Sequence, residues 1–165
     1  MLQWAALFWA AVPRFIACFA TAAAVAVGLG LTATGTFASS HCQPTVGAGA
    51  GPFERLDAPR RAKIGAGHVL QGRILRAGDC KPVARALVVL WQSGPNGYTS
   101  RGRGSVLTDR AGRFRFEGPV PASYGREPHI HIAVQHPDYE ELLARYVVRR
   151  GAKTGKIRLV LTPLL

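Results

Sequence analysis

The chain has 165 residues, of which 48% are hydrophobic and 18% charged, and 21 Lys and Arg against 9 Asp and Glu give a formal net charge of +12. This length allows one ordinary domain and excludes a large multi-domain enzyme. The composition excludes an acidic solvating protein and a chain that is disordered throughout.

The first segment of the chain is apolar. Residues 15–38 contain no charged side chain, and Arg14 precedes them. Such a stretch is long enough to span a bilayer, which takes roughly 20 residues. It also has the order of a signal peptide, because Thr36-Phe37-Ala38 forms a small-residue cleavage site before Ser39. We expect residues 1–38 to be a signal peptide or an uncleaved membrane anchor, and both alternatives place residues 39–165 outside the cytoplasm.

Two cysteines, Cys42 and Cys80, lie in the part expected to be exported. Disulfides form and persist in oxidising compartments, so the pair predicts one disulfide that closes a loop of about 38 residues. Two buried free thiols are the alternative. A metal site built on these two alone is disfavoured because no C-x-x-C spacing occurs.

An extended lead-in is expected over residues 39–67, which are rich in Gly, Ala and Pro. Two strands should follow. His68–Leu75 alternates as a strand does, and Ala84–Trp91 is a nearly continuous apolar run typical of a strand buried on both faces. Ser93–Gly104 holds several Gly and Pro residues and is predicted to be a long loop.

Further short strands are predicted towards the end of the chain, with one helical alternative at Asp138–Arg145. They begin near Val106 and lie at Arg113–Glu117, Pro128–Gln135, Leu142–Val148 and Ile157–Leu161. Short strands separated by Gly and Pro turns are typical of an all-β sandwich. We therefore predict a single immunoglobulin-like or transthyretin-like β-sandwich over residues 68–165.

The run His129-Ile130-His131 carries the first indication of chemistry. Residues i and i+2 of a strand point to the same face, so the two imidazoles project together and Ile130 faces the core. Paired imidazoles suit a transition metal, although two half-exposed histidines are the plain alternative. The remaining histidines are expected at the surface or in turns: His41, His68 and His136.

Two loop tyrosines, Tyr98 and Tyr124, narrow the choice of metal. A phenol has a pKa near 10 and becomes a ligand only for a strongly Lewis-acidic ion. Fe(III) fits hard anionic oxygen combined with imidazole. Two ordinary loop aromatics are the alternative.

With these residues the sequence resembles the intradiol ring-cleavage dioxygenases. Lys81–Gln92 followed by Gly97-Tyr98 is similar to the family segment PxxGAxVxLWQ…GxY. Thr108–Phe114 resembles its TDxxGxF turn, and Pro121–His131 resembles PGxYxxRxPHIH. Gly51-Pro52-Phe53 and the pair Cys42 and Cys80 are similar to the small exported members.

The resemblance implies a function and a set of roles. Tyr98 and His129 would be equatorial iron ligands, Tyr124 and His131 the axial pair, and Arg126 would stabilise negative charge that develops on the substrate ring. The activity implied is cleavage of a catechol-type ring by O₂ between its two hydroxyl-bearing carbons, which gives a muconate-type diacid. The partners implied are thus a small aromatic diol and O₂.

Two positions depart from the family pattern. The interval from Tyr124 to His129 is one residue shorter than usual, and Leu143–Tyr146 lacks the Gln of the family's TQ-x-Y segment. A transthyretin-like binding domain that keeps the fold without turnover is therefore the alternative function. No nucleic-acid partner is expected, because the basic residues form no run and aromatic residues are not interleaved with them.

Overall fold

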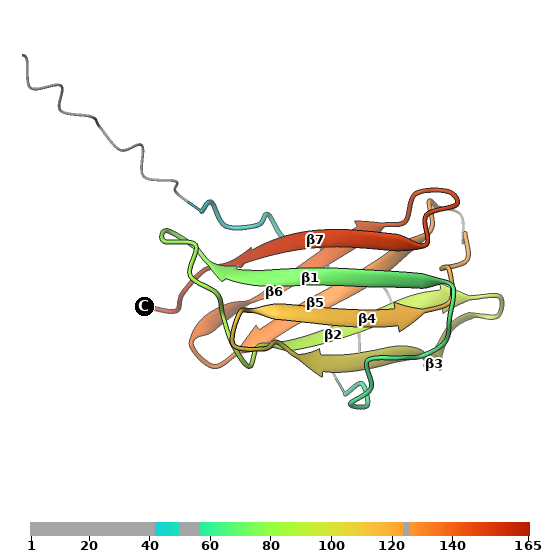
Figure 1. The fold of residues 1–165 in the computed structure, drawn as a ribbon, viewed down its shortest axis with the longest axis horizontal. Helices are drawn as coiled ribbons and strands as arrows, with labels where there is room; N and C mark the ends of the chain where they lie inside the picture. Colours follow the sequence, from blue (N-terminus) through green and yellow to red (C-terminus); the bar gives the residue numbers. More distant parts are fainter. Residues whose placement is uncertain (1–41, 50–56, 124–125) are drawn as a thin grey trace, which may run out of the picture. The chain divides into compact units, whose positions relative to one another are not determined.

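Seven strands and no helix are found in the part of the chain that the structure, a computed structural model, describes: residues 42–49, 57–123 and 126–165. One sheet has the order β4-β1-β7 and the other the order β3-β2-β5-β6 (Figure 1). The strands are β1 (His68–Arg76), β2 (Leu87–Gly94), β3 (Gly97–Leu107), β4 (Arg113–Gly118), β5 (His129–His136), β6 (Tyr139–Val147) and β7 (Thr154–Leu161). The predicted all-β sandwich is confirmed.

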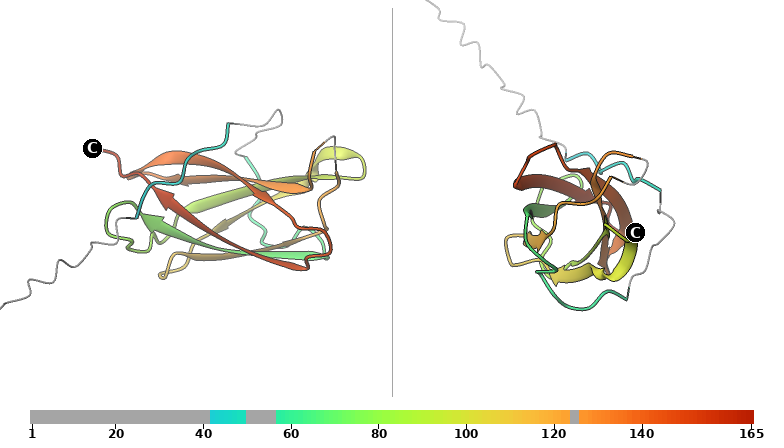
Figure 2. Two further views of the ribbon diagram at one scale, coloured as in Figure 1. Left: turned by 90° about the horizontal axis from the view of Figure 1, so that it is seen from above. Right: turned by 90° about the vertical axis from the view of Figure 1, so that its right-hand side faces the viewer.

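The two sheets lie face to face, as the end view in Figure 2 shows. Period-2 alternation directs one set of side chains between them. Leu90 of β2, Phe116 of β4 and Ile132 of β5 belong to this core and are almost fully buried. Each such side chain contributes roughly 1.5–3 kcal/mol on burial. Because Ile130 and Ile132 face this core, the histidines between and before them face outward, as the alternation predicts.

A second, smaller apolar cluster covers the outer face of the four-stranded sheet. Val89 and Trp91 of β2 and Ala133 of β5 are buried there. The side chains of β2 are therefore buried on both faces of the sheet, which explains the continuous apolar run in its sequence. The described metal-ligand candidates, Tyr98, His129 and His131, lie on this same outer face.

The segment before β1 runs along both open sides of the sandwich. On one side the Thr45 amide donates to the Val160 carbonyl of β7 and the Ala48 amide donates to the Leu143 carbonyl of β6. On the other side the Arg61 amide donates to Ser105 of β3, and the Ile64 amide donates to Glu117 of β4. The lead-in thereby pairs backbone groups of all four edge strands, which protects those edges from pairing with other chains.

Two sequence expectations are wrong. Ser93–Gly104 is not a long loop, because β3 begins at Gly97 and continues to Leu107 after a turn of two residues. The glycines that suggested a loop are needed within the strand: a Cβ at Gly102 would lie 2.6 Å from the Gln92 carbonyl oxygen. The helical alternative for Asp138–Arg145 also fails, because β6 pairs along β5 through this stretch.

Several predictions fall outside the described residues, namely the signal peptide or anchor over residues 1–38, the ligand Tyr124 and the motif Gly51-Pro52-Phe53. Within the described ranges, no helix has the length and apolar character needed to cross a membrane.

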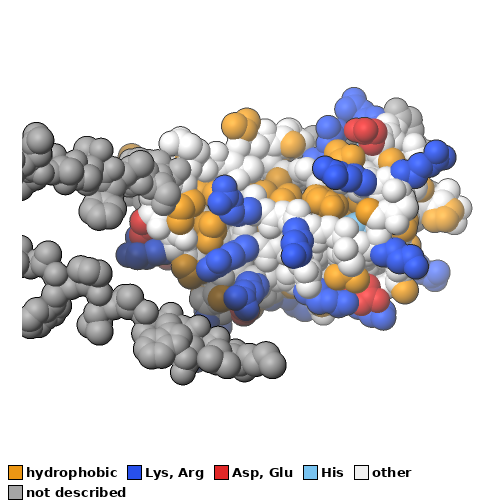
Figure 3. All heavy atoms as spheres, turned by 45° about the horizontal axis from the view of Figure 1, so that its top comes forward, with side chains coloured by type: hydrophobic (Ala, Val, Ile, Leu, Met, Phe, Trp, Pro, Cys, Tyr) orange, Lys and Arg blue, Asp and Glu red, His pale blue; other side chains and the backbone are white. Residues whose placement is uncertain are grey.

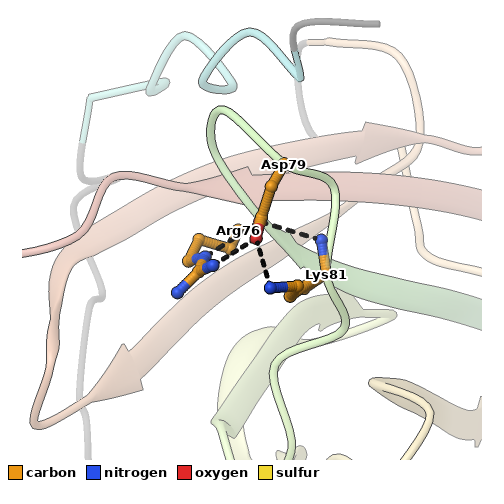
Figure 4. Close-up of polar contacts among 3 residues, drawn as sticks. All are labelled: Arg76, Asp79 and Lys81. Carbon is orange, nitrogen blue, oxygen red and sulfur yellow. Dashed lines mark hydrogen bonds and ion pairs between the residues drawn. The ribbon is translucent and has the colours of Figure 1, made fainter. Parts of the chain in front are cut away.

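The predicted disulfide is present, and it joins Cys42 to Cys80 with a Cα–Cα distance of 5.3 Å. Next to it, the loop after β1 is held by charge. Asp79 accepts a hydrogen bond of 2.8 Å from Arg76 Nε and forms a 3.2 Å ion pair with Lys81 Nζ (Figure 4). These contacts lower the pKa of Asp79, chiefly through the Arg76 hydrogen bond. The lead-in is thus tied covalently to a loop that is itself fixed.

Removing this disulfide should destabilise the domain. We expect a Cys42→Ser, Cys80→Ser variant to lose about 3–4 kcal/mol of unfolding free energy, because the open chain regains the entropy of a 38-residue loop. Urea unfolding of both proteins measures the difference. A reductant should lower the wild-type midpoint to that of the variant and leave the variant unchanged; equal midpoints for oxidised wild type and variant would contradict this expectation.

Basic side chains are spread over the surface. Figure 3 shows Lys and Arg scattered across the visible face with apolar groups between them. Some are neutralised locally, since Glu117 pairs with Lys63 and Arg115 at 3.0 Å each. The expectation that the surplus serves no nucleic acid stays a prediction.

Candidate metal centre

Tyr98 reaches the outer face of the four-stranded sheet through an irregular hairpin. Trp91 pairs with Arg103 and Ser93 pairs with Tyr98, so the single residue of β2 between these pairs is matched by four residues of β3. The extra residues of this bulge bend β3, as bulges do beside functional sites. Tyr98 is half-buried and lies directly opposite Ser93 at the end of the sheet.

The two histidines come from the start of β5 and meet the tyrosine. Tyr98 Oη lies 3.2 Å from His129 Nε2 and 3.1 Å from His131 Nε2, and the two Nε2 atoms are 3.1 Å apart. The structure therefore brings three of the four predicted ligands together. Tyr124, the fourth, is not among the described residues.

The hydrogen bonding of the two imidazoles favours a cation between Tyr98, His129 and His131. His129 Nδ1 lies 2.7 Å from the Glu127 carbonyl, which can only accept, so Nδ1 carries the proton and Nε2 presents its lone pair to the cluster. Burial, with smaller contributions from His129 and Arg145, lowers the pKa of His131 to about 4. His131 is thus neutral near pH 7, and the single phenol proton of Tyr98 cannot satisfy both imidazoles at once.

The distances also fit a metal. Donors held about 2.1 Å from a first-row ion lie about 3.0 Å apart when their bonds to it are at right angles, and about 3.4 Å apart in a tetrahedron. The observed 3.1–3.2 Å falls between these values. Among the described residues, no group of three His, Cys, Asp or Glu side chains is arranged to hold a metal ion, so the described part of this centre depends on a phenol as well as on imidazole.

The phenol restricts the ion to a strong Lewis acid. Burial raises the pKa of Tyr98, and the Ser93 hydroxyl and the charge of Arg145 offset this only in part. Without a metal the phenol therefore stays protonated near neutral pH. Fe(III) is able to displace that proton and hold the phenolate, so the described donors fit the predicted ion.

Trp91 supports this centre from β2. Its ring stacks on that of His131 with centroids 5.0 Å apart and planes 8° apart. Trp91 is 2% exposed, so it fixes the imidazole plane from a rigid part of the sheet. From the sequence, Trp91 is expected at the end of a buried strand and within the segment similar to LWQ, but no local pattern indicates that its ring stacks on His131.

Hydrogen bonds hold the described residues on either side of positions 124 and 125. Gln92 Nε2 donates to the Pro119 carbonyl at 2.7 Å, and the Ser93 hydroxyl donates to the Ala122 carbonyl at 2.8 Å. The Ser123 hydroxyl then donates to the Arg126 carbonyl at 2.8 Å, across the two residues that are not described. The end of β2 therefore positions the segment that leads to Arg126.

Arg126 is exposed and lines a cavity of about 270 Å³ with Glu127, Arg145 and Val147. Val147 pairs with His129 and Arg145 pairs with His131 across β5 and β6. Side chains directly opposite each other in antiparallel strands lie on the same face, so the cavity adjoins the histidines. Arg145 is a site residue that sequence reasoning missed, because only the strand register reveals its neighbour.

One other histidine differs from expectation. His68 is not at the surface: it begins β1, is 2% exposed, and its Nδ1 lies 2.8 Å from the Ala152 carbonyl. This hydrogen bond and the neighbouring Tyr146 ring, 5.9 Å away between centroids, give it a structural role away from the metal centre.

The fold and the three described donors agree with the family that the sequence resembles, and comparison with known proteins supports that resemblance. The 6-chlorohydroxyquinol 1,2-dioxygenase of Cupriavidus pinatubonensis is 30% identical over an alignment that covers 67% of this chain and 51% of that protein. The chain thus spans about half the length of this curated relative. No family model matches the chain.

Solved structures share the fold. The dioxygenase domain of a dioxygenase carbohydrate-binding fusion from Streptomyces sp. SirexAA-E superposes with a TM-score of 0.64 at 22% identity, covering 74% of this chain and 100% of that one. An intradiol ring-cleavage dioxygenase from Tetranychus urticae gives 0.62 at 18% identity, over 75% and 97% of the two chains. The hydroxyquinol 1,2-dioxygenase of Pseudomonas putida DLL-E4 gives 0.60 at 19%, over 77% and 68%.

Proposed function

We propose that this protein is a non-haem Fe(III)-dependent intradiol dioxygenase that cleaves a catechol-type aromatic ring. In this proposal Tyr98, Tyr124, His129 and His131 hold the iron. The observation that carries it is the convergence of Tyr98 Oη and two imidazole Nε2 atoms within 3.2 Å of one another. The named dioxygenases that share its fold and part of its sequence support the reaction class.

Bound Fe(III) would supply Lewis acidity, drawing electron density from the diol ring so that a ring carbon reacts with O₂. The reaction balances without another reductant: both oxygen atoms enter the product, and catechol plus O₂ gives the muconate-type diacid. Two tyrosinates and one hydroxide would balance the triple charge of the ion, which accounts for the two tyrosines in the proposed ligand set.

The side chains of the chain itself have three tasks. His129, fixed by the Glu127 carbonyl, and His131, fixed by Trp91, hold their donor atoms in place before substrate arrives. Tyr124 accepts a proton from a diol hydroxyl at its phenolate oxygen. Arg126, on the wall of the adjoining cavity, stabilises negative charge that develops on the ring.

We place this activity outside the cytoplasm. The disulfide between Cys42 and Cys80 supports that location, because such bonds persist in oxidising compartments and are rare in the cytosol. The apolar segment before Ser39 is the export signal or anchor in this proposal.

The experiment that tests the function is oxygen uptake by the iron-loaded protein. We expect a red protein, because tyrosinate bound to Fe(III) absorbs visible light, and one O₂ consumed for each catechol with a ring-opened diacid as product. Tyr98→Phe should lose most of the visible absorption and the uptake. A coloured protein that binds catechol without consuming O₂ would establish the alternative, a binding domain without turnover, and a colourless iron-loaded protein would overturn the ligand set.

A further inference from the structure

A row of four side chains crosses the outer face of the four-stranded sheet. The register pairs Arg103 with Trp91, Trp91 with His131, and His131 with Arg145. Directly paired residues in antiparallel strands lie on the same face. The metal-binding His131 therefore has a tryptophan on one side and a guanidinium on the other.

The guanidinium of Arg145 is exposed and has no acidic partner. Among the described residues no Asp or Glu lies within ion-pair distance of it, whereas Arg115 and Arg76 each pair with an acid. Its charge still lies beside the metal centre, because Arg145 is paired directly with His131 across β5 and β6. Arg145 thus acts on the site without being neutralised there.

A cation at this position works against metal binding. Like charges repel, and a neighbouring guanidinium disfavours a trivalent ion in the site unless an anion compensates both. The protein supplies one acid in the cavity, Glu127, against two guanidiniums, Arg126 and Arg145. The charged residues that line the cavity therefore sum to +1, which favours an anionic group on a ligand that binds there.

The adjoining cavity has the size for that ligand. Its volume is about 270 Å³, whereas an apolar cavity of about 150 Å³ suffices to bind benzene. Its walls combine one apolar side chain, Val147, with the two guanidiniums. A planar guanidinium forms paired hydrogen bonds with a carboxylate, which gives orientation as well as affinity.

We propose that Arg145 is the specificity-determining residue of this site and binds a carboxylate carried by the aromatic ring of the substrate. The preferred substrate class is then the carboxylated aromatic diols, in place of unsubstituted catechol. This inference rests on the proposed function for the identity of the diol. Arg145 takes no part in ring cleavage; it selects and orients the ring.

Anaerobic binding tests this inference separately from turnover. Iron-loaded protein is titrated without O₂ with 3,4-dihydroxybenzoate and with catechol, and the change in the visible absorption gives a dissociation constant for each. We expect Arg145→Ala to weaken 3,4-dihydroxybenzoate by about tenfold or more, the loss of a charge-assisted pair, and catechol by less than about twofold. Arg145→Lys should fall between wild type and Arg145→Ala, and added salt should reduce the preference.

The matched control is Arg158→Ala. Arg158 is exposed on β7 of the other sheet, so this variant has the same charge change far from the centre, and we expect it to keep the preference. Equal losses in the two variants, or equal effects of Arg145→Ala on both ligands, would overturn the inference. If the wild type prefers 3,4-dihydroxybenzoate over catechol, Arg145→Ala loses that preference and no O₂ is consumed, the role of Arg145 is supported and the proposed function is refuted. Failure of the wild type to bind either diol would refute both.

Discussion

Replacing His131 with alanine should reduce iron affinity by about hundredfold or more and abolish turnover. Outer-shell partners of a metal already change its affinity by 10–100-fold, and His131 is one of three donors that meet within 3.2 Å. Its removal also leaves Trp91 without the ring stacked on it. Iron content after dialysis against a chelator, together with the visible absorption of the loaded protein, measures the effect.

The control for this variant lies on the same strand. His136 ends β5, is partly buried, and accepts a hydrogen bond from the Asp138 amide, away from the donor atoms. His136→Ala removes an imidazole of equal size, and we expect it to retain iron and colour. If His131→Ala binds iron as tightly as wild type and stays red, the centre built on Tyr98, His129 and His131 is wrong.

The part of this centre that could be predicted from the sequence is the pair of histidines, because strand periodicity alone decides which face they share. A strand places i and i+2 on one face whatever its neighbours are, so His129 and His131 could be paired without knowledge of the sheet. The position of Tyr98 relative to the histidines could not be predicted from residue spacing, because it depends on a bulge in β3 that no local sequence pattern indicates. Its phenol made it a candidate for Fe(III), resemblance to a family assigned it a ligand role, and the distances to the two imidazoles are consistent with that role.

The misses have a common cause. The Gly-rich stretch Ser93–Gly104 favours a loop by composition, yet Gly102 and Gly104 are required where the Gln92 and Arg61 carbonyl oxygens approach to within 2.6 and 2.5 Å of a Cβ position. Arg145 lies in the stretch Leu143–Tyr146 that departs from the family pattern, but only the pairing of β6 with β5 places it beside His131. Both facts depend on contacts between segments distant in sequence, which composition and period do not encode.

Trp91 contributes both to the packing of the sandwich and to the orientation of the His131 ring, so its replacement should affect stability and metal binding. The side chain is 2% exposed and packs with Val89 and Ala133 in the outer cluster. Trp91→Ala should therefore cost about 3–5 kcal/mol of unfolding free energy, as large-to-small changes at buried aromatics do. Domains of this size are stable by about 5–15 kcal/mol, so the loss is a large share.

Comparison with Trp91→Phe separates packing from hydrogen bonding. Among the described residues the indole Nε1 has no hydrogen-bond partner although it is buried, and an unpaired buried donor costs about 1–3 kcal/mol. Phenylalanine removes this donor and keeps a stacking ring, so Trp91→Phe should lose less than about 2 kcal/mol and retain iron. Urea unfolding of the metal-free proteins measures the packing cost, and iron titration of each variant measures the effect on His131. If Trp91→Phe proves as costly as Trp91→Ala in the metal-free state, packing is not what Trp91 contributes and the indole N–H has a partner of its own.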